Sequence, residues 1–300
     1  MRISKNKTYS LRSSIHLTSK LILKDFLKIN NRLNSNDFHI KKGIDWLVLA
    51  QNLTKNGGVS KGYNLFSGWL PSYPETSGYI IPTLIDYSDL VGDKKYLKVC
   101  EEIADWECSI QLRNGAFKAN KIKDNYIYYI FDTGQILIGL LRAYKKLKKN
   151  KYLNCAIKAG NFIAENQDEK GTWKKFTFQN LSHTYNVRVA WILLELFLIT
   201  NEEKFKLSAI KNIEWTLKQM TKNFWFKKIN YTNAPLTHFI SYTIRGLLES
   251  GIILNDSHLK KISLNSALQL MNYFDKYNNL PATFNSEWCS KDHYSCLTGN

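Results

Sequence analysis

Hydrophobic residues fall into two alternating kinds of segment along this chain. In the first kind they form one stripe, and Lys and Glu occupy the remaining positions, which predicts amphipathic helices. These helices are predicted at residues 39–54, 96–111, 152–167, 205–219 and 259–274, after an earlier amphipathic helix at 13–33. Segments of the second kind, such as Ala190 to Ile199, are apolar nearly all round, which is typical of buried helices.

The two kinds of segment repeat with one period. Each apolar segment begins with a polar or aromatic stretch, and the equivalent positions are Gly78, Gly134, Val187, Ser241 and Gly299. Their spacing is roughly 53 to 58 residues, and the aromatic residues of the amphipathic helices follow nearly the same interval. A fixed period of this kind indicates a repeat architecture built from helical pairs.

A ring of helical hairpins explains this pattern best. If the apolar helices form an inner barrel and the amphipathic helices an outer one, the chain is an all-α protein with an α/α toroid fold. Open solenoids of the TPR or HEAT type have shorter repeats of about 34 to 47 residues, so they are a weaker alternative. We expect residues 1–38 to form a basic N-terminal segment with one helix, and residues 39–300 to form the toroid.

The number of repeats leads to a further expectation. The last apolar helix has only begun at Thr298, so a six-hairpin ring would lack about one and a half repeats. We therefore expect a toroid that is incomplete at its C-terminal end. It should appear as an open arc with apolar side chains exposed at its end, and residues 289–300 should be poorly packed.

Composition bears on the cellular compartment and on the kind of partner. The five cysteines have no framework spacing, which favours a reducing compartment, and no signal peptide or apolar run of membrane-spanning length is evident. A cytoplasmic location and no membrane span are therefore expected. The formal net charge is +17, which indicates either solvated lysines or an anionic partner. No nucleic-acid-binding motif accompanies the lysines, so an acidic ligand is preferred to nucleic acid.

The candidate site lies where the apolar helices begin. In a toroid all inner helices run the same way, so their electropositive N-terminal ends meet at one mouth. The candidate catalytic residues at these positions are Glu75, Asp132, His183 and His238. The candidate substrate-binding residues are Tyr73, Tyr79, Gln135, Tyr185, Arg188, Tyr242, Glu287 and Trp288. Aromatic faces that alternate with carboxylates, Arg and His suit a sugar ring, so the expected partner is a glycan or activated sugar.

Two chemistries are compatible with these residues. Glu75 and Asp132, or one of them with Glu287 or Asp292, can act as acid and base in glycoside hydrolysis. Alternatively, His183 and His238 can abstract and return a proton next to a uronate or keto carbon, as in an epimerase or lyase, with Arg188 neutralising the developing charge. A non-catalytic glycan-binding or scaffold protein is the rival from another class. Terpenoid-cyclase-like activity is less favoured, because no Asp-rich motif is present. No cofactor is expected.

Structural roles compete with each functional one. Glu75 and Asp132 can be first-turn helix charges, and His183 and His238 can be core or capping histidines. Arg188 and Arg245 lie in apolar segments, where a guanidinium needs a partner, so pairing with Glu75, Asp132 or Glu195 is as plausible as ligand binding. Pro82 is expected to kink the first inner helix or to delay its start.

Two further motifs are given no functional role. Cys289, His293 and Cys296 lie close together, but their spacing matches no strong zinc pattern, and no metal site is assigned to them. The segment from Lys158 to Trp173 looks like the QW repeat of terpenoid cyclases, in which a Gln caps helix ends and stacks on a Trp. That motif is structural, so it supports the toroid and says little about the substrate.

Several motifs together resemble a known family. They are Ser72–Leu84, Phe131–Gln135, Thr184–Arg188 and Ser295–Asn300. In these motifs the chain resembles bacterial α/α-toroid proteins of exopolysaccharide and cell-surface glycan gene clusters, which are similar to six-hairpin glycosidases. The resemblance implies a carbohydrate-active protein of surface-polysaccharide metabolism. It assigns no catalytic residue, because the activity of that family is poorly defined.

Overall fold

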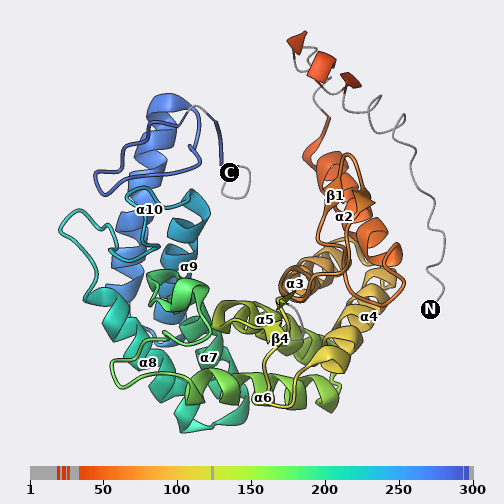
Figure 1. Ribbon diagram of the computed structural model, residues 1–300, viewed down its shortest axis with the longest axis horizontal. Coiled ribbons are helices and arrows are strands. Elements are labelled where there is room, and N and C mark those ends of the chain that lie inside the picture. The colour runs from red at the N-terminus through yellow and green to blue at the C-terminus, as the bar shows by residue number, and fades with distance from the viewer. Residues whose placement is uncertain are drawn as a thin grey trace.

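The computed structural model describes residues 19–20, 22–24, 26–27, 34–122, 125–292 and 294–296. Over these residues the chain is an arc of paired helices that stays open between its two ends (Figure 1). The all-α toroid architecture predicted from the repeats is therefore confirmed, and the open arc was also expected. Most of the helix predicted at 13–33 lies outside the described residues.

The helices form two concentric layers. The outer layer contains α2 (Asn36–Asn52), α4 (Lys95–Ile110), α6 (Asn150–Glu165), α8 (Glu203–Leu217) and α10 (Ser257–Tyr277). The inner layer contains α3 (Pro74–Val91), α5 (Ile130–Leu147), α7 (Val187–Thr200) and α9 (Thr237–Ile253). Each inner helix packs on the next inner helix and on the outer helix that follows it. Residues 189–194 of α7 are all buried, as expected for a helix that is apolar nearly all round.

Glycines set the closest approach between two inner helices. A Cβ on Gly139 of α5 would lie 2.0 Å from the carbonyl oxygen of Gly78 in α3, and a Cβ on Gly78 would lie 2.5 Å from Cα of Ile136. Only glycine permits this backbone contact. The contact holds the second turn of α3 against the second and third turns of α5.

Glutamines at the ends of the outer helices connect consecutive repeats. The Gln111 side-chain amide donates to the carbonyls of Gly115 and Cys155, and Gln167 donates in the same way to Gly171 and Ser208. Trp173 is buried, and its indole N–H donates to the Ile163 carbonyl. The QW-like motif therefore has the structural role expected for it.

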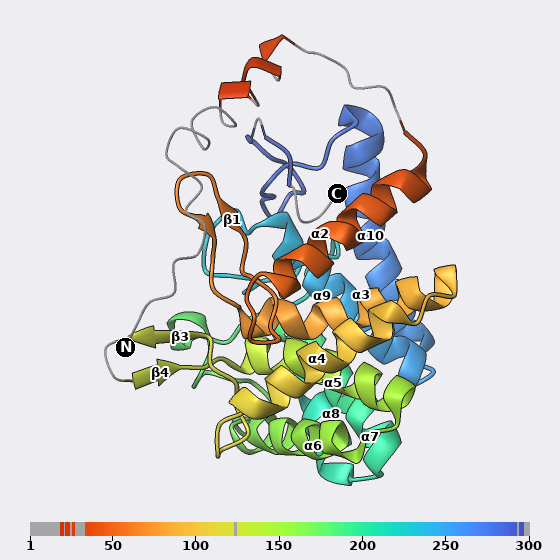
Figure 2. The same cartoon turned by 90° about the vertical axis from the view of Figure 1, so that its right-hand side faces the viewer.

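The loops before the inner helices carry short strands that the sequence did not indicate. Strands β1 (Tyr63–Asn64) and β2 (Gly68–Trp69) form one antiparallel pair, and β3 (Asn120–Ile122) and β4 (Asn125–Ile127) form another. Two 3₁₀ turns, η1 (Phe178–Asn180) and η2 (Thr184–Asn186), precede α7. Both strand pairs lie on one side of the arc, opposite the turn that joins α3 to α4 (Figure 2).

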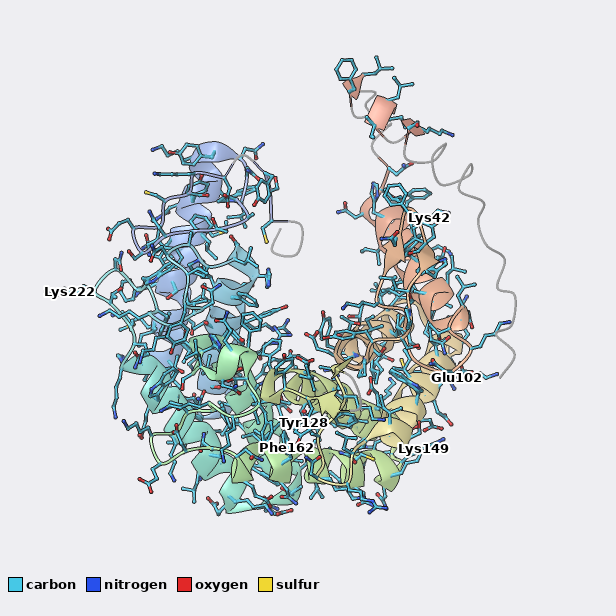
Figure 3. All side chains as sticks on the ribbon, in the orientation of Figure 1. Lys42, Glu102, Tyr128, Lys149, Phe162 and Lys222 are labelled. Atoms are coloured by element: carbon cyan, nitrogen blue, oxygen red, sulfur yellow. The ribbon has the colours of Figure 1, made fainter. Side chains whose placement is uncertain are left out.

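Some of the basic residues form ion pairs between repeats. Lys145 binds Glu195, Lys149 binds Glu101 and Lys151 binds Asp105, and each of these ion pairs joins neighbouring repeats. Lys149 and Lys222 lie at the periphery, whereas Tyr128 and Phe162 pack together inside it (Figure 3). Exposed pairs of this kind add little stability each, but they account for part of the high Lys content.

The two ends of the arc expose apolar side chains, as expected. They include Trp46 and Leu49 on α2, and Leu264, Leu268 and Met271 on α10. In the described part of the chain no helix is long and apolar enough to span a membrane.

One of the two alternatives for Pro82 was wrong. Pro82 does not delay the first inner helix, because α3 begins at Pro74 and continues through Pro82 to Val91, and a kink at Pro82 stays a prediction. The described residues after 288 are packed only in part, because Cys289, Lys291, Tyr294 and Ser295 are exposed. Cys296 is buried and its backbone N–H donates to Leu280, and Ala282 binds Tyr294 in the same way. Residues 297–300 lie outside the described part.

Candidate functional site

The candidate site is built by the first turns of the inner helices. Glu75 lies in the first turn of α3, Asp132 in the first turn of α5, Arg188 at the start of α7 and His238 at the start of α9. The side-to-side packing of α3, α5, α7 and α9 places these turns at one edge of the inner layer. Helix N-termini provide a positive potential there.

The two carboxyl groups are each perturbed. Burial, followed by the nearby charge of Asp132, raises the pKa of Glu75 to about 7, although Arg188 and Lys61 act in the opposite direction. Burial also raises the pKa of Asp132 to about 6, and the Tyr73 hydroxyl, which donates to Oδ2 at 3.3 Å, counteracts part of this shift. Asp132 is only 8% exposed, whereas Glu75 is half-buried. Two carboxyl groups with such raised and different pKa values can divide the roles of acid and base.

Arg188 provides the positive charge of the site. Its Nε donates to Oε1 of Gln135 at 2.6 Å, and its guanidinium carbon lies 4.8 Å from the centre of the Tyr242 ring. It forms no ion pair with any residue that the structure describes. Its charge therefore reaches Glu75 without being cancelled by a direct carboxylate contact. Tyr79 also lies in the field of Glu75, Arg188 and Tyr242.

Stacked rings form one wall of the site. Tyr185 lies between His183 and Phe239, with ring centres 4.9 Å apart on each side. Phe131 packs against both Tyr185 and Tyr242 at 5.2 Å. Rings held in this way lose little further freedom when a ligand binds, which suits a rigid apolar wall.

The two candidate histidines have different environments. His183 is 2% exposed, and its Nε2 lies 2.9 Å from the carbonyl oxygen of Phe178. His238 is half-buried and contacts the rings of Phe239 and Tyr242. Burial lowers the pKa of both rings. His183 is therefore held as a structural residue behind the wall, and His238 is the more accessible histidine.

Two expectations about side chains do not hold. Trp288 is a core residue, because its ring packs edge-on against Trp225 and its indole N–H donates to the Asn223 carbonyl. Arg245 is exposed and pairs with Glu249, so it does not pair with Glu75, Asp132 or Glu195. Glu287, beside Trp288, is exposed on its loop, and its contact with a substrate stays a prediction.

Lys61 was missed by the sequence analysis. Its ammonium lies 4.7 Å from the centre of the Tyr73 ring and lowers the pKa of both Glu75 and Asp132. Lys61 reaches the site because its backbone N–H donates to the Pro71 carbonyl, which folds the loop back on itself. Its sequence neighbours form an ordinary polar loop and contain no signal of this role.

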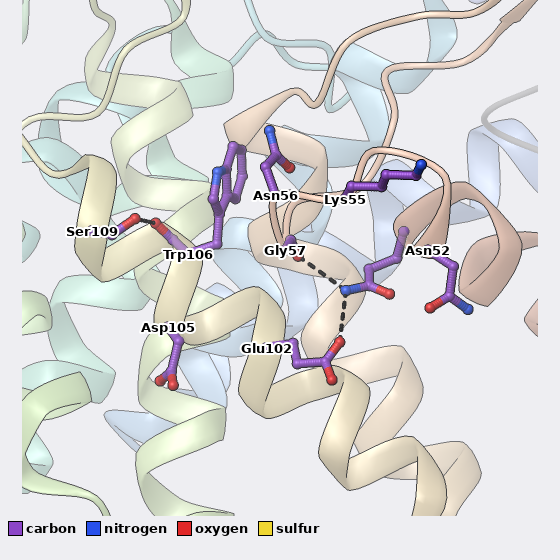
Figure 4. A pocket seen from close by; sticks show the side chains of 9 residues that line it. Asn52, Lys55, Asn56, Gly57, Glu102, Asp105, Trp106 and Ser109 are labelled. Atoms are coloured by element: carbon purple, nitrogen blue, oxygen red, sulfur yellow. Dashed lines mark hydrogen bonds between the residues drawn. The ribbon is translucent and has the colours of Figure 1, made fainter. Parts of the chain in front are cut away.

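Neither Glu75 nor Asp132 lines the hollow beside α2. This hollow of about 520 Å³ lies between the end of α2 and the outer face of α4, where Glu102 and Trp106 contribute to its lining (Figure 4). Among the described residues no cluster of His, Cys, Asp and Glu could hold a metal ion. His293 lies outside those residues.

Comparison with known proteins finds the same fold in several solved structures. No protein-family model matches the sequence, and no curated protein does. An unsaturated glucuronyl hydrolase specific for heparin superposes with a TM-score of 0.64 at 16% identity, over 78% of this chain and 66% of that one. A cellobiose 2-epimerase from Spirochaeta thermophila gives 0.62 at 10% identity, over 83% and 72%. The GH76 α-mannanase BT2949 of Bacteroides thetaiotaomicron gives 0.56 at 14% identity, over 80% and 70%.

These similarities establish the fold. The chain has an α/α toroid fold, which it shares with these solved structures. At this level of identity the activity must be argued from the site itself.

Proposed function

We propose that this protein is a carbohydrate-active enzyme that hydrolyses an acidic glycan. Glu75 is the general acid that protonates the leaving oxygen, and Asp132 is the general base that activates water. The observation that carries the proposal is the carboxyl pair, with pKa values of about 7 and about 6 at the start of adjacent inner helices. The structural neighbours, which include glycosidases and sugar epimerases, support a sugar substrate.

The protonation states follow from the surroundings. At pH 6.5 the higher pKa leaves Glu75 mostly protonated, and the lower one leaves Asp132 mostly ionised. The Tyr73 hydroxyl favours the ionised form of Asp132, because it donates a hydrogen bond to that carboxylate. Glu75 is the more exposed of the two and is therefore the group that a substrate oxygen reaches first.

Arg188 selects the class of substrate. Its guanidinium carries full charge, has one N–H fixed on Gln135, and has no carboxylate partner among the described residues. A uronate carboxylate on the substrate would supply that partner, since guanidinium and carboxylate groups match in geometry. The resemblance to proteins of surface-glycan gene clusters suggests bacterial exopolysaccharides as the first acidic glycans to assay.

A second candidate is epimerase or lyase chemistry. It is favoured by His238, whose lowered pKa keeps the ring neutral near pH 7 and able to accept a proton beside Tyr242. His183 supports this chemistry less well, because its ring is enclosed and already bound to Phe178.

Substitution separates these functions. Glu75→Gln, Asp132→Asn and His238→Ala would be assayed on uronate-containing and neutral oligosaccharides, with new reducing ends and new epimers followed separately. The exposed residue Glu203 provides a matched control as Glu203→Gln. Hydrolysis predicts a loss of at least 10²-fold in the first two variants, and Arg188→Gln should raise KM for uronates more than for neutral sugars. Full hydrolytic turnover in Glu75→Gln and Asp132→Asn would refute the proposal, and glycan binding without turnover in the wild type would favour a binding protein.

A further inference from the structure

A pair of cysteines joins two consecutive outer helices. Cys108, near the end of α4, and Cys155, in the middle of α6, are close enough for each thiol to shift the pKa of the other. Cys108 Sγ also lies 4.0 Å from the carbonyl oxygen of Lys151, one turn before Cys155. One turn after Cys108, the Gln111 side chain donates to the Cys155 carbonyl at 2.9 Å. Contacts on both sides of the pair therefore fix this part of α4 against α6.

The two thiols are chemically unequal. The adjacent Cys108 thiol lowers the pKa of Cys155, and the nearby charges of Lys158 and Lys151 act in the same direction. The adjacent Cys155 thiol, together with burial, raises the pKa of Cys108. Both residues are partly exposed. Cys155 thus has the environment of a reactive thiolate, and Cys108 is in the position of a resolving thiol.

We propose that Cys108 and Cys155 form a reversible oxidation site, at which a peroxide converts the reduced pair into a disulfide between α4 and α6. The Cys155 thiolate attacks one oxygen of hydrogen peroxide and becomes a sulfenic acid, and hydroxide leaves. Cys108 then attacks the Cys155 sulfur, the S–S bond forms, and the sulfenic oxygen leaves as water with the Cys108 proton. Overall, two thiols and one peroxide give one disulfide and two waters.

The disulfide would connect the α3–α4 hairpin to the α5–α6 hairpin, which carry Glu75 and Asp132. In the reduced protein this junction depends on side-chain and backbone contacts alone. A covalent link across it restricts the unfolded chain and should make the oxidised protein more resistant to heat.

The other cysteines provide internal controls. Cys100 is completely buried, and burial raises the pKa of its thiol to about 12. Cys289 is exposed, but it lies on the loop after α10, far along the chain from the pair. Accessibility alone would favour oxidation of Cys289, whereas the proposal favours Cys155.

The full-length protein would be treated with one equivalent of hydrogen peroxide, alkylated and digested without reduction. The expected product is a cross-linked peptide of Cys108 and Cys155 that has lost two hydrogens, together with a rise in Tm of several degrees that dithiothreitol reverses. In Cys108→Ser the cross-link should disappear and dimedone should label Cys155, whereas Cys289→Ser should behave as the wild type.

Two results would overturn the proposal. The first is a wild-type protein that keeps both thiols alkylatable after peroxide treatment has oxidised other cysteines. The second is dimedone labelling of Cys155 in Cys108→Ser that is no faster than labelling of Cys289. If Cys108→Ser does not fold, the relative rates at which iodoacetamide alkylates Cys155 and Cys289 in the wild type decide the question, and equal rates count against it.

Discussion

Gly139→Ala tests how the carboxyl pair is positioned. The added Cβ would lie 2.0 Å from the Gly78 carbonyl oxygen and 2.8 Å from the carbonyl carbon, and neither atom can move without moving α3. Alanine gains about 1 kcal/mol over glycine in a helix, whereas overpacking a core costs about 1–3 kcal/mol. Because the obstacle is backbone, we take the upper end and expect a net loss of about 2 kcal/mol. For a chain of 300 residues that loss corresponds to a fall in Tm of about 3 °C.

The same displacement should impair the site. Separation of α3 from α5 moves Glu75 relative to Asp132, and an error of about 1 Å in a catalytic arrangement can cost about 10²-fold in rate. Thermal unfolding followed by circular dichroism and turnover of the glycan substrate would be measured on the same samples.

Gly43→Ala is the matched control. Gly43 lies within α2, and a Cβ there would meet nothing within 4 Å. This variant should gain about 0.5–1 kcal/mol from helix propensity and keep full activity. If Gly139→Ala is as stable and as active as Gly43→Ala, the close contact between α3 and α5 does not position the site.

Three shorter predictions follow from buried polar groups. Activity should follow a bell-shaped pH profile centred near 6.5, because Asp132 protonates below about 6 and Glu75 ionises above about 7; a flat profile between pH 5 and 8 would contradict the assignment. Glu107 is 0% exposed and both of its carboxyl oxygens lack a hydrogen-bond partner, and burial raises its pKa well above 4.5. The neutral carboxyl group is therefore compatible with the fold at low pH. Stability is lost as the pH rises through the folded-state pKa, because the buried group must then ionise. Glu107→Gln should therefore have a higher Tm than the wild type at pH 8 and an equal one at pH 4.5, and a gain of the same size at both would exclude ionisation as the cause. Gln167→Ala should lower the free energy of unfolding, measured by chemical denaturation, by about 1–3 kcal/mol, because the Gly171 and Ser208 carbonyls of two repeats lose this donor. Gln219→Ala should lower it less, because the Gln219 side chain donates to Trp215 in the preceding turn and does not connect two repeats.

Periodicity predicted most of the helical framework. The amphipathic segments at 96–111 and 152–167 match α4 and α6 within a residue or two, because burial of one stripe is a local property of the sequence. The paired strands were not predictable in the same way. Tyr63–Asn64 and Gly68–Trp69 are too short to show an alternating pattern, and the pairing depends on the loop as a whole.

The candidate site was best predicted where a residue lies at the start of an inner helix. Glu75, Asp132 and Arg188 lie near the starts of successive inner helices, and the packing of those helices side by side gives them a common edge. Trp288 was misplaced and Lys61 was missed because both lie on loops. On a loop, position in the sequence does not determine the direction of a side chain, and turns and backbone hydrogen bonds do.

The serial contacts between helices also determine the order in which the site appears during synthesis. Asp132 can meet Glu75 once α3 and α5 have been made, but Arg188 follows its partner Gln135 by 53 residues. At about 5–20 residues per second the ribosome needs roughly 3 to 11 s to add them. During that interval Glu75 lacks Arg188, one of the two positive charges that lower its pKa in the finished protein, and only Lys61 acts in that direction.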